Sequence, residues 1–234
     1  MIHLSQRLQA IADFVPQGAA VADIGTDHGF LPCYLAQQQR ADKLIACDVN
    51  AQPLALAQKN IEDYNLQEQV QTRLGDGLTV LQPDEVTVVT IAGMGGENIA
   101  AILRAAPWAC RNTLCILQPM SRPEELRAAL PSLGLTIRAD RLVRDARRLY
   151  PVLAVRAGAP EALSAGELYC GKYSLLSNDT LFSDILAEQD KRLDIAVRGL
   201  ECSGRESDRE RLNALRLAAA DIAKMRRKYH GDGS

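Results

Sequence analysis

Short apolar runs rich in β-branched residues alternate with amphipathic helical patterns over the first half of the chain. The runs that predict strands cover residues 20–24, 43–49, 70–74, 86–91 and 113–118. The helical patterns lie between and after them, at residues 31–38, 53–64, 97–106 and 123–133. Regular alternation of strands and helices is typical of a parallel sheet that is covered on both faces. The pattern therefore predicts a doubly wound α/β domain.

A helix precedes this alternation, and a different pattern follows it. Residues 4–15 place apolar side chains at helical spacing, and Ser5 can cap the start of that helix. Residues 135–137 and 152–155 are strand-like runs without a helical pattern between them, which favours an antiparallel hairpin at the sheet edge. The sequence Gly158-Ala159-Pro160 then punctuates the chain. We therefore predict a main domain of residues 1–160 and a C-terminal segment of residues 161–234.

The C-terminal segment carries two apolar stripes with alternating spacings of four and three residues. The first consists of Phe182, Leu186, Gln189, Leu193, Ala196 and Leu200, and the second of Leu212, Leu215, Ala219, Ile222, Arg226 and Tyr229. Ser203 and Gly204 are expected to form the turn between the two helices. The short break favours an antiparallel coiled-coil hairpin within one chain, and dimerisation is the alternative. We therefore expect a monomer, with a dimer left open.

Composition narrows the class of protein without defining a partner. The chain has 234 residues, of which 47% are hydrophobic, enough for one full core and a small appendage. Its net charge is −2, so any nucleic-acid surface must come from local clusters of Lys and Arg. The six cysteines are dispersed and form no Cys-x-x-Cys pair, which favours reduced thiols over a zinc site or a disulfide framework. No apolar run approaches the ~20 residues that span a bilayer, and no signal peptide is recognisable. We expect a cytoplasmic protein that binds neither membrane nor metal.

The most informative polar segment is residues 23–31, Asp-Ile-Gly-Thr-Asp-His-Gly-Phe-Leu, where the first strand of the alternation ends and the next helix begins. Glycine permits positive φ and a close approach of ligand to backbone, and free amides at a helix start favour polar or anionic groups. Nucleotide-like ligands bind at this position in α/β sheets. The full Gly-x-Gly-x-x-Gly fingerprint is absent, so an ordinary strand-to-helix turn explains this segment alone equally well.

Polar or glycine-rich segments also end the next three predicted strands. They are Asp48-Val49-Asn50, Gly75-Asp76-Gly77 and Ala92-Gly93-Met94-Gly95. Asp48 can accept hydrogen bonds from ribose hydroxyls and Asp76 from an adenine amino group, while helix capping and turn chemistry are the alternatives. Because a doubly wound sheet gathers these strand ends along one crevice, the set favours an adenosine-containing cofactor. The acid-rich turn Asp23-x-Gly25-x-Asp27 suits S-adenosylmethionine, whose amino-acid end is cationic and which has no pyrophosphate.

These motifs resemble the bacterial tRNA (adenine-22-N1)-methyltransferase family. The resemblance covers essentially the whole chain and rests on Leu4-Ser5-Gln6-Arg7-Leu8, on Leu31-Pro32, on Gly75-Asp76-Gly77-Leu78 and on residues 22–28 and 91–96. It implies a Rossmann-like class I methyltransferase domain, followed by a coiled coil, that methylates N1 of adenine 22 in tRNA. It also implies that the S-adenosylmethionine pocket is lined by Gly25, Thr26, Asp27, Asp48, Asp76, Gly93 and Met94, with Arg7 and His28 nearby. The motif neighbours complete the expected cofactor-binding set: Asp23, Val49, Asn50, Gly75, Gly77, Ala92 and Gly95.

The implied reaction needs little acid–base chemistry. The N1 atom of adenine has an in-plane lone pair and can attack a sulfonium methyl group without first losing a proton. Alignment of the reacting atoms and exclusion of water then account for most of the expected acceleration. Asp27 is the candidate catalytic carboxylate, which can stabilise the cationic product or orient the adenine amino group; the alternative is that it only holds the ammonium group of the cofactor. Methylation of a small molecule, and RNA binding without catalysis, remain alternative functions.

Two clusters of basic residues are candidates for contact with RNA phosphates. The first cluster lies in the predicted edge hairpin and contains Arg141, Arg144, Arg147 and Arg148. The second lies near the end of the last helix and contains Lys224, Arg226, Arg227 and Lys228. A solvated face is the alternative for each cluster, with Asp140 and Asp145 as compensating acids in the first.

Overall fold

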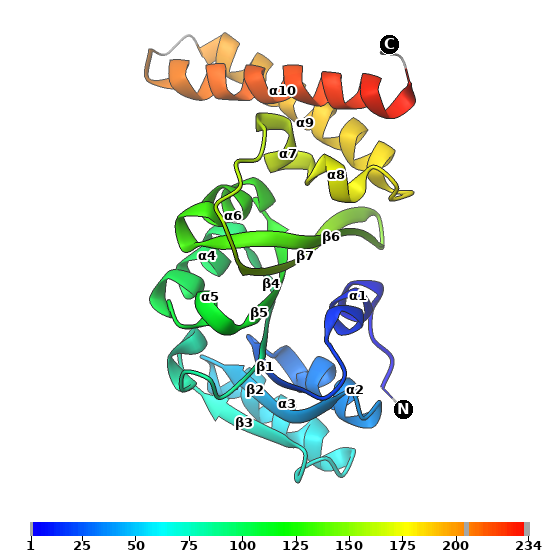
Figure 1. Cartoon of the computed structure of the whole chain (residues 1–234), viewed down its shortest axis with the longest axis vertical. Coiled ribbons are helices and arrows are strands. Elements are labelled where there is room, and N and C mark those ends of the chain that lie inside the picture. The colour runs from blue at the N-terminus through cyan, green and yellow to red at the C-terminus, as the bar shows by residue number, and fades with distance from the viewer. Residues whose placement is uncertain (1, 204–205, 232–234) are drawn as a thin grey trace. The chain divides into compact units, whose positions relative to one another are not determined.

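The computed structural model describes residues 2–203 and 206–231, which divide into two compact units (Figure 1). The first unit contains the chain up to Ala139 together with Val143–Glu161. The second contains Asp140–Leu142 and the chain from Ala162 onward. The division falls close to the Gly158-Ala159-Pro160 punctuation of the sequence.

The first unit is built around a seven-stranded sheet with the order β3-β2-β1-β4-β5-β7-β6. In chain order the strands are β1 (Ala19–Ile24), β2 (Ala41–Asp48), β3 (Val70–Leu74), β4 (Val88–Gly95), β5 (Leu114–Ser121), β6 (Leu135–Asp145) and β7 (Arg148–Ala157). The first five strands are parallel, and β7 is antiparallel to β5. The strand order reverses between β1 and β4, which is where α/β sheets open a ligand crevice outside the strand ends. The predicted doubly wound α/β class is confirmed.

Helices flank this sheet, and the sequence pattern predicts all but the short α5. They are α1 (Gln6–Phe14), α2 (Phe30–Gln37), α3 (Ala51–Asp63), α4 (Gly96–Ala105), α5 (Ala109–Asn112) and α6 (Pro123–Ala129). Short 3₁₀ turns cover Asp27–Gly29, Gly77–Val80 and Pro131–Leu133. Ser5 caps α1, because its hydroxyl accepts a hydrogen bond from the Leu8 amide at 3.3 Å.

Several element boundaries differ from the prediction. The predicted helix over residues 123–133 ends at Ala129, because Pro131 lacks an amide donor and starts a separate 3₁₀ turn. The fourth strand runs on to Gly95, so part of the expected glycine turn belongs to β4. The edge strands β6 and β7 are much longer than the apolar runs that predicted them, because exposed and buried positions are mixed along β6 and hide its extent. Their connection is a tight turn at residues 146–147, in which Ala146 has a φ of 52°.

The second unit consists of helices. They are α7 (Ala165–Cys170), α8 (Tyr173–Leu176), α9 (Phe182–Ser203) and α10 (Arg209–His230), with a 3₁₀ turn at Glu206–Asp208. Ion pairs join Glu201 to Arg216 and Asp190 to Arg226, both at 2.6 Å, and this pairing order makes α9 and α10 antiparallel. The predicted helical hairpin is therefore present. Ser203 still belongs to α9, and Gly204 of the predicted turn lies outside the described residues.

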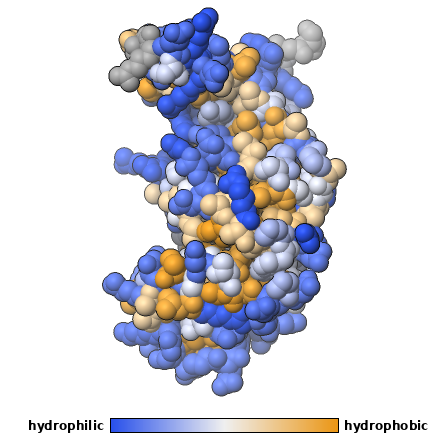
Figure 2. Space-filling model, turned by 90° about the vertical axis from the view of Figure 1, so that its left-hand side faces the viewer, coloured by the Kyte–Doolittle hydropathy of each residue, from blue (hydrophilic) through white to orange (hydrophobic). Residues whose placement is uncertain are grey.

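The buried stripe of α10 is shifted from the predicted one. Leu215 and Ile222 are buried as expected, but Ala218 and Met225 are buried instead of Ala219 and Arg226. The reason is that α7 also packs on α10: the Gly166 amide donates to the Asp221 carboxylate at 2.7 Å. On the face shown in Figure 2, these C-terminal helices present mostly hydrophilic side chains. Among the described residues, no helix combines the length and hydropathy needed to cross a membrane.

Candidate cofactor site

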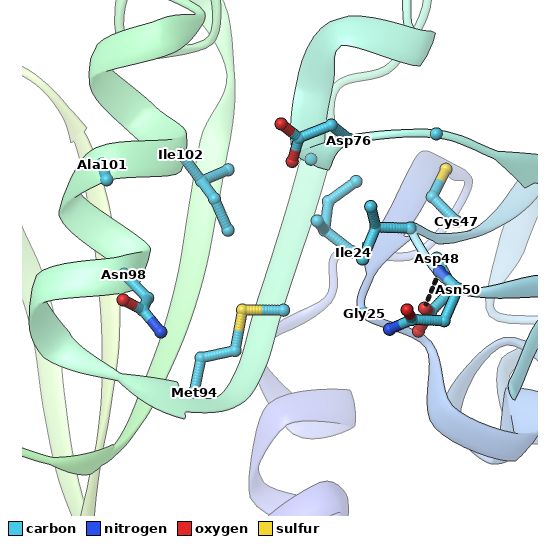
Figure 3. A pocket seen from close by; sticks show the side chains of 13 residues that line it. Ile24, Gly25, Cys47, Asp48, Asn50, Asp76, Met94, Asn98, Ala101 and Ile102 are labelled. Carbon is cyan, nitrogen blue, oxygen red and sulfur yellow. Dashed lines mark hydrogen bonds between the residues drawn. The ribbon is translucent and has the colours of Figure 1, made fainter.

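A pocket of about 350 Å³ opens in the first unit, where the carboxyl ends of β1 to β4 face α4 (Figure 3). Eight of the residues predicted for the cofactor site line it: Gly25, Asp48, Val49, Asn50, Gly75, Asp76, Gly77 and Met94. Five further residues complete the lining: Ile24, Cys47, Asn98, Ala101 and Ile102. The sheet therefore brings together the polar ends of four strands that are distant in sequence.

The turn after β1 forms one wall of the pocket. Gly25 has a φ of +72°, which a side chain rarely adopts, and a Cβ atom there would lie 2.3 Å from Cε of Met94. The amides of Gly25 and Thr26 both donate to the Cys47 carbonyl at 2.9 Å. The sequence led us to expect free amides in this segment, and for these two residues that expectation is wrong. They fix the end of β1 to the end of β2 rather than facing a ligand.

Asp48 ends β2 and points a carboxylate into the pocket. Its side chain is almost fully buried, and Oδ1 accepts a hydrogen bond from the Asn50 amide at 2.8 Å. The second oxygen, Oδ2, has no partner among the described residues. Asn50 occupies the N-cap position of α3, but its side chain makes no capping bond there. The turn contact therefore uses one Asp48 oxygen and leaves the other, at the pocket, available to a ligand hydroxyl.

Asp76 and α4 form the opposite part of the lining. The Asp76 side chain is exposed and makes no hydrogen bond within the described structure, while its backbone carbonyl accepts from the Thr79 amide and hydroxyl. Gly77 has a φ of +53°, and a Cβ atom there would lie 3.1 Å from Ile102. Figure 3 shows Asn98 and Ile102 across the pocket from Asp48. An acid and an apolar side chain together suit the edge and the face of a heteroaromatic base.

Sequence reasoning missed the contribution of α4, although a signal for it exists. Asn98, Ala101 and Ile102 follow the glycine run at the spacing i, i+3 and i+4, which places them on one helix face. Ile24 and Cys47 are the apolar residues at or next to the ends of their strands. Burial raises the pKa of the Cys47 thiol to about 12, so this cysteine lines the pocket as a neutral apolar group.

The other predicted residues of the β1 turn do not line the pocket. Asp23 is buried behind the turn, where the Thr90 hydroxyl donates to its Oδ1 at 2.6 Å and burial raises the pKa of its carboxyl. The Thr26 hydroxyl is also buried and has no partner with good hydrogen-bond geometry. Asp27 and His28 form an exposed pair at 3.4 Å, in which the Asp27 side chain is 77% exposed. The structure thus separates a buried acid, Asp23, from an exposed one, Asp27.

Arg7 and the Ala92–Gly95 segment lie beside the pocket rather than in it, apart from Met94. Nη1 of Arg7 donates to Oε1 of Gln118 at 2.8 Å, and the Gly93 amide donates to the same oxygen at 3.2 Å. Nε of Arg7 contacts Asp145 at 3.4 Å, and its guanidinium lies 5.6 Å from the centre of the Tyr150 ring. Arg7 is therefore engaged by protein groups.

The basic clusters differ in how their side chains are exposed and paired. Arg144, Arg147 and Arg148 are exposed near the β6–β7 turn, and Arg141 is partly buried. In the second cluster, Arg226 pairs with Asp190, and Nζ of Lys228 lies 4.2 Å from the centre of the Tyr173 ring. Lys224 and Arg227 are exposed. In the part of the chain that the structure describes, no group of His, Cys, Asp and Glu side chains could hold a metal ion.

Comparison with known proteins supports the same class of protein as the fold and the pocket. Residues 4–153 match the family described as "Methyltransferase domain", so the fold and site define a methyltransferase. The chain is 36% identical over 174 residues to the tRNA (adenine(22)-N(1))-methyltransferase of Bacillus subtilis, which covers 71% of this chain and 73% of the relative. The chain belongs to the tRNA (adenine(22)-N(1))-methyltransferase family.

Solved structures extend this similarity to nearly the full length. A putative tRNA (m1A22) methyltransferase of Streptococcus pneumoniae, solved in complex with S-adenosyl-L-methionine, matches with a TM-score of 0.82 and 32% identity, over 96% of this chain and 100% of the other. The B. subtilis M1A22 tRNA methyltransferase matches with a TM-score of 0.86 and 28% identity, over 97% of this chain and 100% of the other. The resemblance seen in the sequence motifs is confirmed.

Proposed function

We propose that this protein transfers the methyl group of S-adenosylmethionine to N1 of adenine 22 in tRNA. The observation that carries the proposal is the pocket at the strand-order reversal, in which a buried carboxylate, Asp48, keeps one oxygen without a partner beside a positive-φ glycine turn. Family membership supplies the choice of cofactor, substrate and nucleotide position.

The residues of the pocket fit such a cofactor. Asp48 would accept hydrogen bonds from the ribose hydroxyls, Asp76 would accept from the adenine amino group, and Ile102 would pack on the adenine face. When bound, the cofactor supplies an electrophilic methyl group on a sulfonium. None of the described residues that line the pocket is a Lys or Arg, so the lining places no positive charge against that cation.

The chain then has to position the acceptor adenine and exclude water. Asp27, whose carboxylate is exposed two residues beyond Gly25, is proposed to orient the adenine amino group or to stabilise the positive charge that methylation creates on the base. No general base is required, because N1 attacks through its lone pair. The remaining predicted site residues, Arg7, Asp23, Thr26, His28, Gly93 and their neighbours, are proposed to shape and support the pocket.

For the RNA, we propose that residues 1–160 form the catalytic domain and that the segment 161–234 helps to hold the tRNA. The exposed arginines near the β6–β7 turn and the free charges of α10, Lys224 and Arg227, are the candidate phosphate contacts. Pairing of α9 with α10 within one chain supports a monomer. Six free cysteines support a reducing, cytoplasmic location.

The test uses the full-length protein with methyl-labelled S-adenosylmethionine and unmodified bulk tRNA. After digestion to nucleosides, we expect the label in 1-methyladenosine, and we expect it to disappear when a transcript carries guanine at position 22. Label in other nucleosides, or only in small molecules, would contradict the proposal. Binding of tRNA without any transfer of label would instead favour a non-catalytic RNA-binding protein.

A further inference from the structure

The glycine segment at the end of β4 is held by a side chain that lies outside the pocket. In the β4–β5 ladder Ala92 pairs with Gln118 and Met94 pairs with Pro119, so the register shifts at Gly93. Such a bulge leaves one residue outside the regular ladder. Gly93 is the residue left outside the ladder, and its φ is +79°. Its amide donates a hydrogen bond to Oε1 of Gln118. The next residue, Met94, lines the pocket.

Gln118 is itself fixed from two sides. Its side chain is fully buried, and its Nε2 donates to the Pro119 carbonyl at 2.9 Å. Its Oε1 also accepts from Arg7, whose guanidinium contacts Asp145 at the end of β6 and lies near the Tyr150 ring. One carboxamide thereby connects helix α1 to the β4 bulge, and every group in the network belongs to the first unit.

We propose that Gln118 and Arg7 are positioning residues for methyl transfer: by holding the Gly93 bulge, they set the direction in which Met94 projects into the pocket. The proposal rests on the proposed function. Its physical basis is that loss of the shared acceptor would leave the Gly93 amide and one Arg7 nitrogen without their partner, so the bulge could rearrange. Asp48 and Asp76, which would hold the ribose and the adenine, belong to other strand ends, so binding of the cofactor should be affected less than methyl transfer.

The test compares Gln118→Leu, which removes the acceptor, with Gln118→Glu, which keeps the acceptor for both donors and loses only the donor to the Pro119 carbonyl. We expect Gln118→Leu to lower kcat for tRNA methylation at least tenfold with the dissociation constant of S-adenosylmethionine within threefold of wild type. Gln118→Glu should lose clearly less of kcat than Gln118→Leu, because Arg7 and the Gly93 amide keep their shared acceptor. Arg7→Met should repeat the loss of kcat, and it provides a second variant at a position nearer the surface if Gln118→Leu does not fold.

Arg40→Met is the matched control. Like Arg7, Arg40 ties helix α1 to the rest of the first unit, because its guanidinium donates to the carbonyls of Asp13 and Val15. It makes no hydrogen bond to Gln118. We expect this variant to lower the melting temperature and to leave kcat unchanged at a temperature where it is folded. An equal loss of kcat in Arg40→Met, or a loss of cofactor affinity that matches the loss of kcat in Gln118→Leu, would reduce the network to general stability and overturn the proposal.

A readout without turnover separates this proposal from the proposed function. The chain has four methionines, so the methyl signal of Met94 can be assigned by NMR through Met94→Leu. We expect this signal to shift or broaden in Gln118→Leu and Arg7→Met, and to return to its original position in Gln118→Glu. An unchanged signal would overturn the positioning role even in an active enzyme. A wild-type protein without activity on tRNA would overturn the proposed function while this signal still tests the network.

Discussion

Of two carboxylates near the pocket, one is buried and the other is exposed, so their replacement should affect different steps of the reaction. Asp48 is buried with one oxygen free for a ligand, so we expect Asp48→Ala to weaken binding of S-adenosylmethionine by about 1–3 kcal/mol. Asp27 is exposed and outside the lining, so we expect Asp27→Asn to leave this affinity unchanged and to lower kcat about tenfold or more. Calorimetric titration and single-turnover methylation measure the two effects separately. A loss of cofactor affinity in Asp27→Asn equal to that of Asp48→Ala would assign Asp27 to the ammonium group instead.

The rule that ligands gather at strand ends explains which pocket residues the sequence could predict. Asp48, Asp76 and Met94 all follow or end parallel strands, and the topology alone brings them together. It does not determine which way each neighbouring side chain points, so Asp23 lies behind the turn and Arg7 lies beside the bulge. Those positions depend on contacts with Thr90 and Gln118, which are distant in sequence.

At the scale of secondary-structure elements, the carboxylate of Glu85 connects the two strands β2 and β3 at one edge of the sheet. Glu85 accepts from Nη1 of Arg73 on β3 at 2.7 Å and from Nζ of Lys43 on β2 at 3.0 Å. Hydrogen bonding to Arg73 holds the pKa of the Glu85 carboxyl well below its usual range. A lowered pKa means that the stabilisation exists above the ordinary pKa of about 4.3 and is lost as the pH falls below it. We expect Glu85→Gln to lower the free energy of unfolding by about 1–2 kcal/mol at pH 7, with a smaller difference at pH 3.

Urea denaturation of both proteins at the two pH values measures this difference. Asp84→Asn is the matched control, because the neighbouring Asp84 is exposed and accepts only a long hydrogen bond of 3.4 Å from Asn112. It should change stability by a few tenths of a kcal/mol at most. A Glu85→Gln difference that is the same at pH 7 and pH 3 would show that the carboxylate charge is not its source.

The elements that were hardest to predict lie where local pattern and tertiary contacts disagree. Strands β1 to β3 are short and bounded by turns, and the sequence predicts them within about two residues. In β6, arginines and aspartates occupy many of the positions between buried residues, so an apolar-run criterion sees only its first three residues. In α10, contact with α7 as well as α9 rotates the buried face, and Met225 takes the place predicted for Arg226. Periodicity finds such a helix, but its neighbours decide which face is buried.

At the scale of the whole molecule, a net charge of −2 makes RNA binding depend on local clusters, and two of them offer free charges. We expect the double replacement of Arg147 and Arg148 by Gln, and separately that of Lys224 and Arg227, to weaken tRNA binding and to reduce its salt dependence. Each lost phosphate contact should lower the slope of log K against log salt by about 1. Filter binding over a series of salt concentrations measures both quantities, while cofactor affinity should stay constant.

A control variant that loses two positive charges elsewhere on the first unit shows whether the position of the charges matters for tRNA binding. Arg104 and Arg111 are exposed, make no ion pair within the described structure, and line a different pocket of the first unit. Their double replacement by Gln removes the same two charges, so a purely non-specific attraction would weaken tRNA binding as strongly as either cluster variant. If only the Arg147/Arg148 variant weakens binding, the RNA contact lies on the first unit, and the C-terminal helices must serve another purpose. If tRNA affinity falls in both cluster variants and not in the Arg104/Arg111 variant, both units contact the bound tRNA.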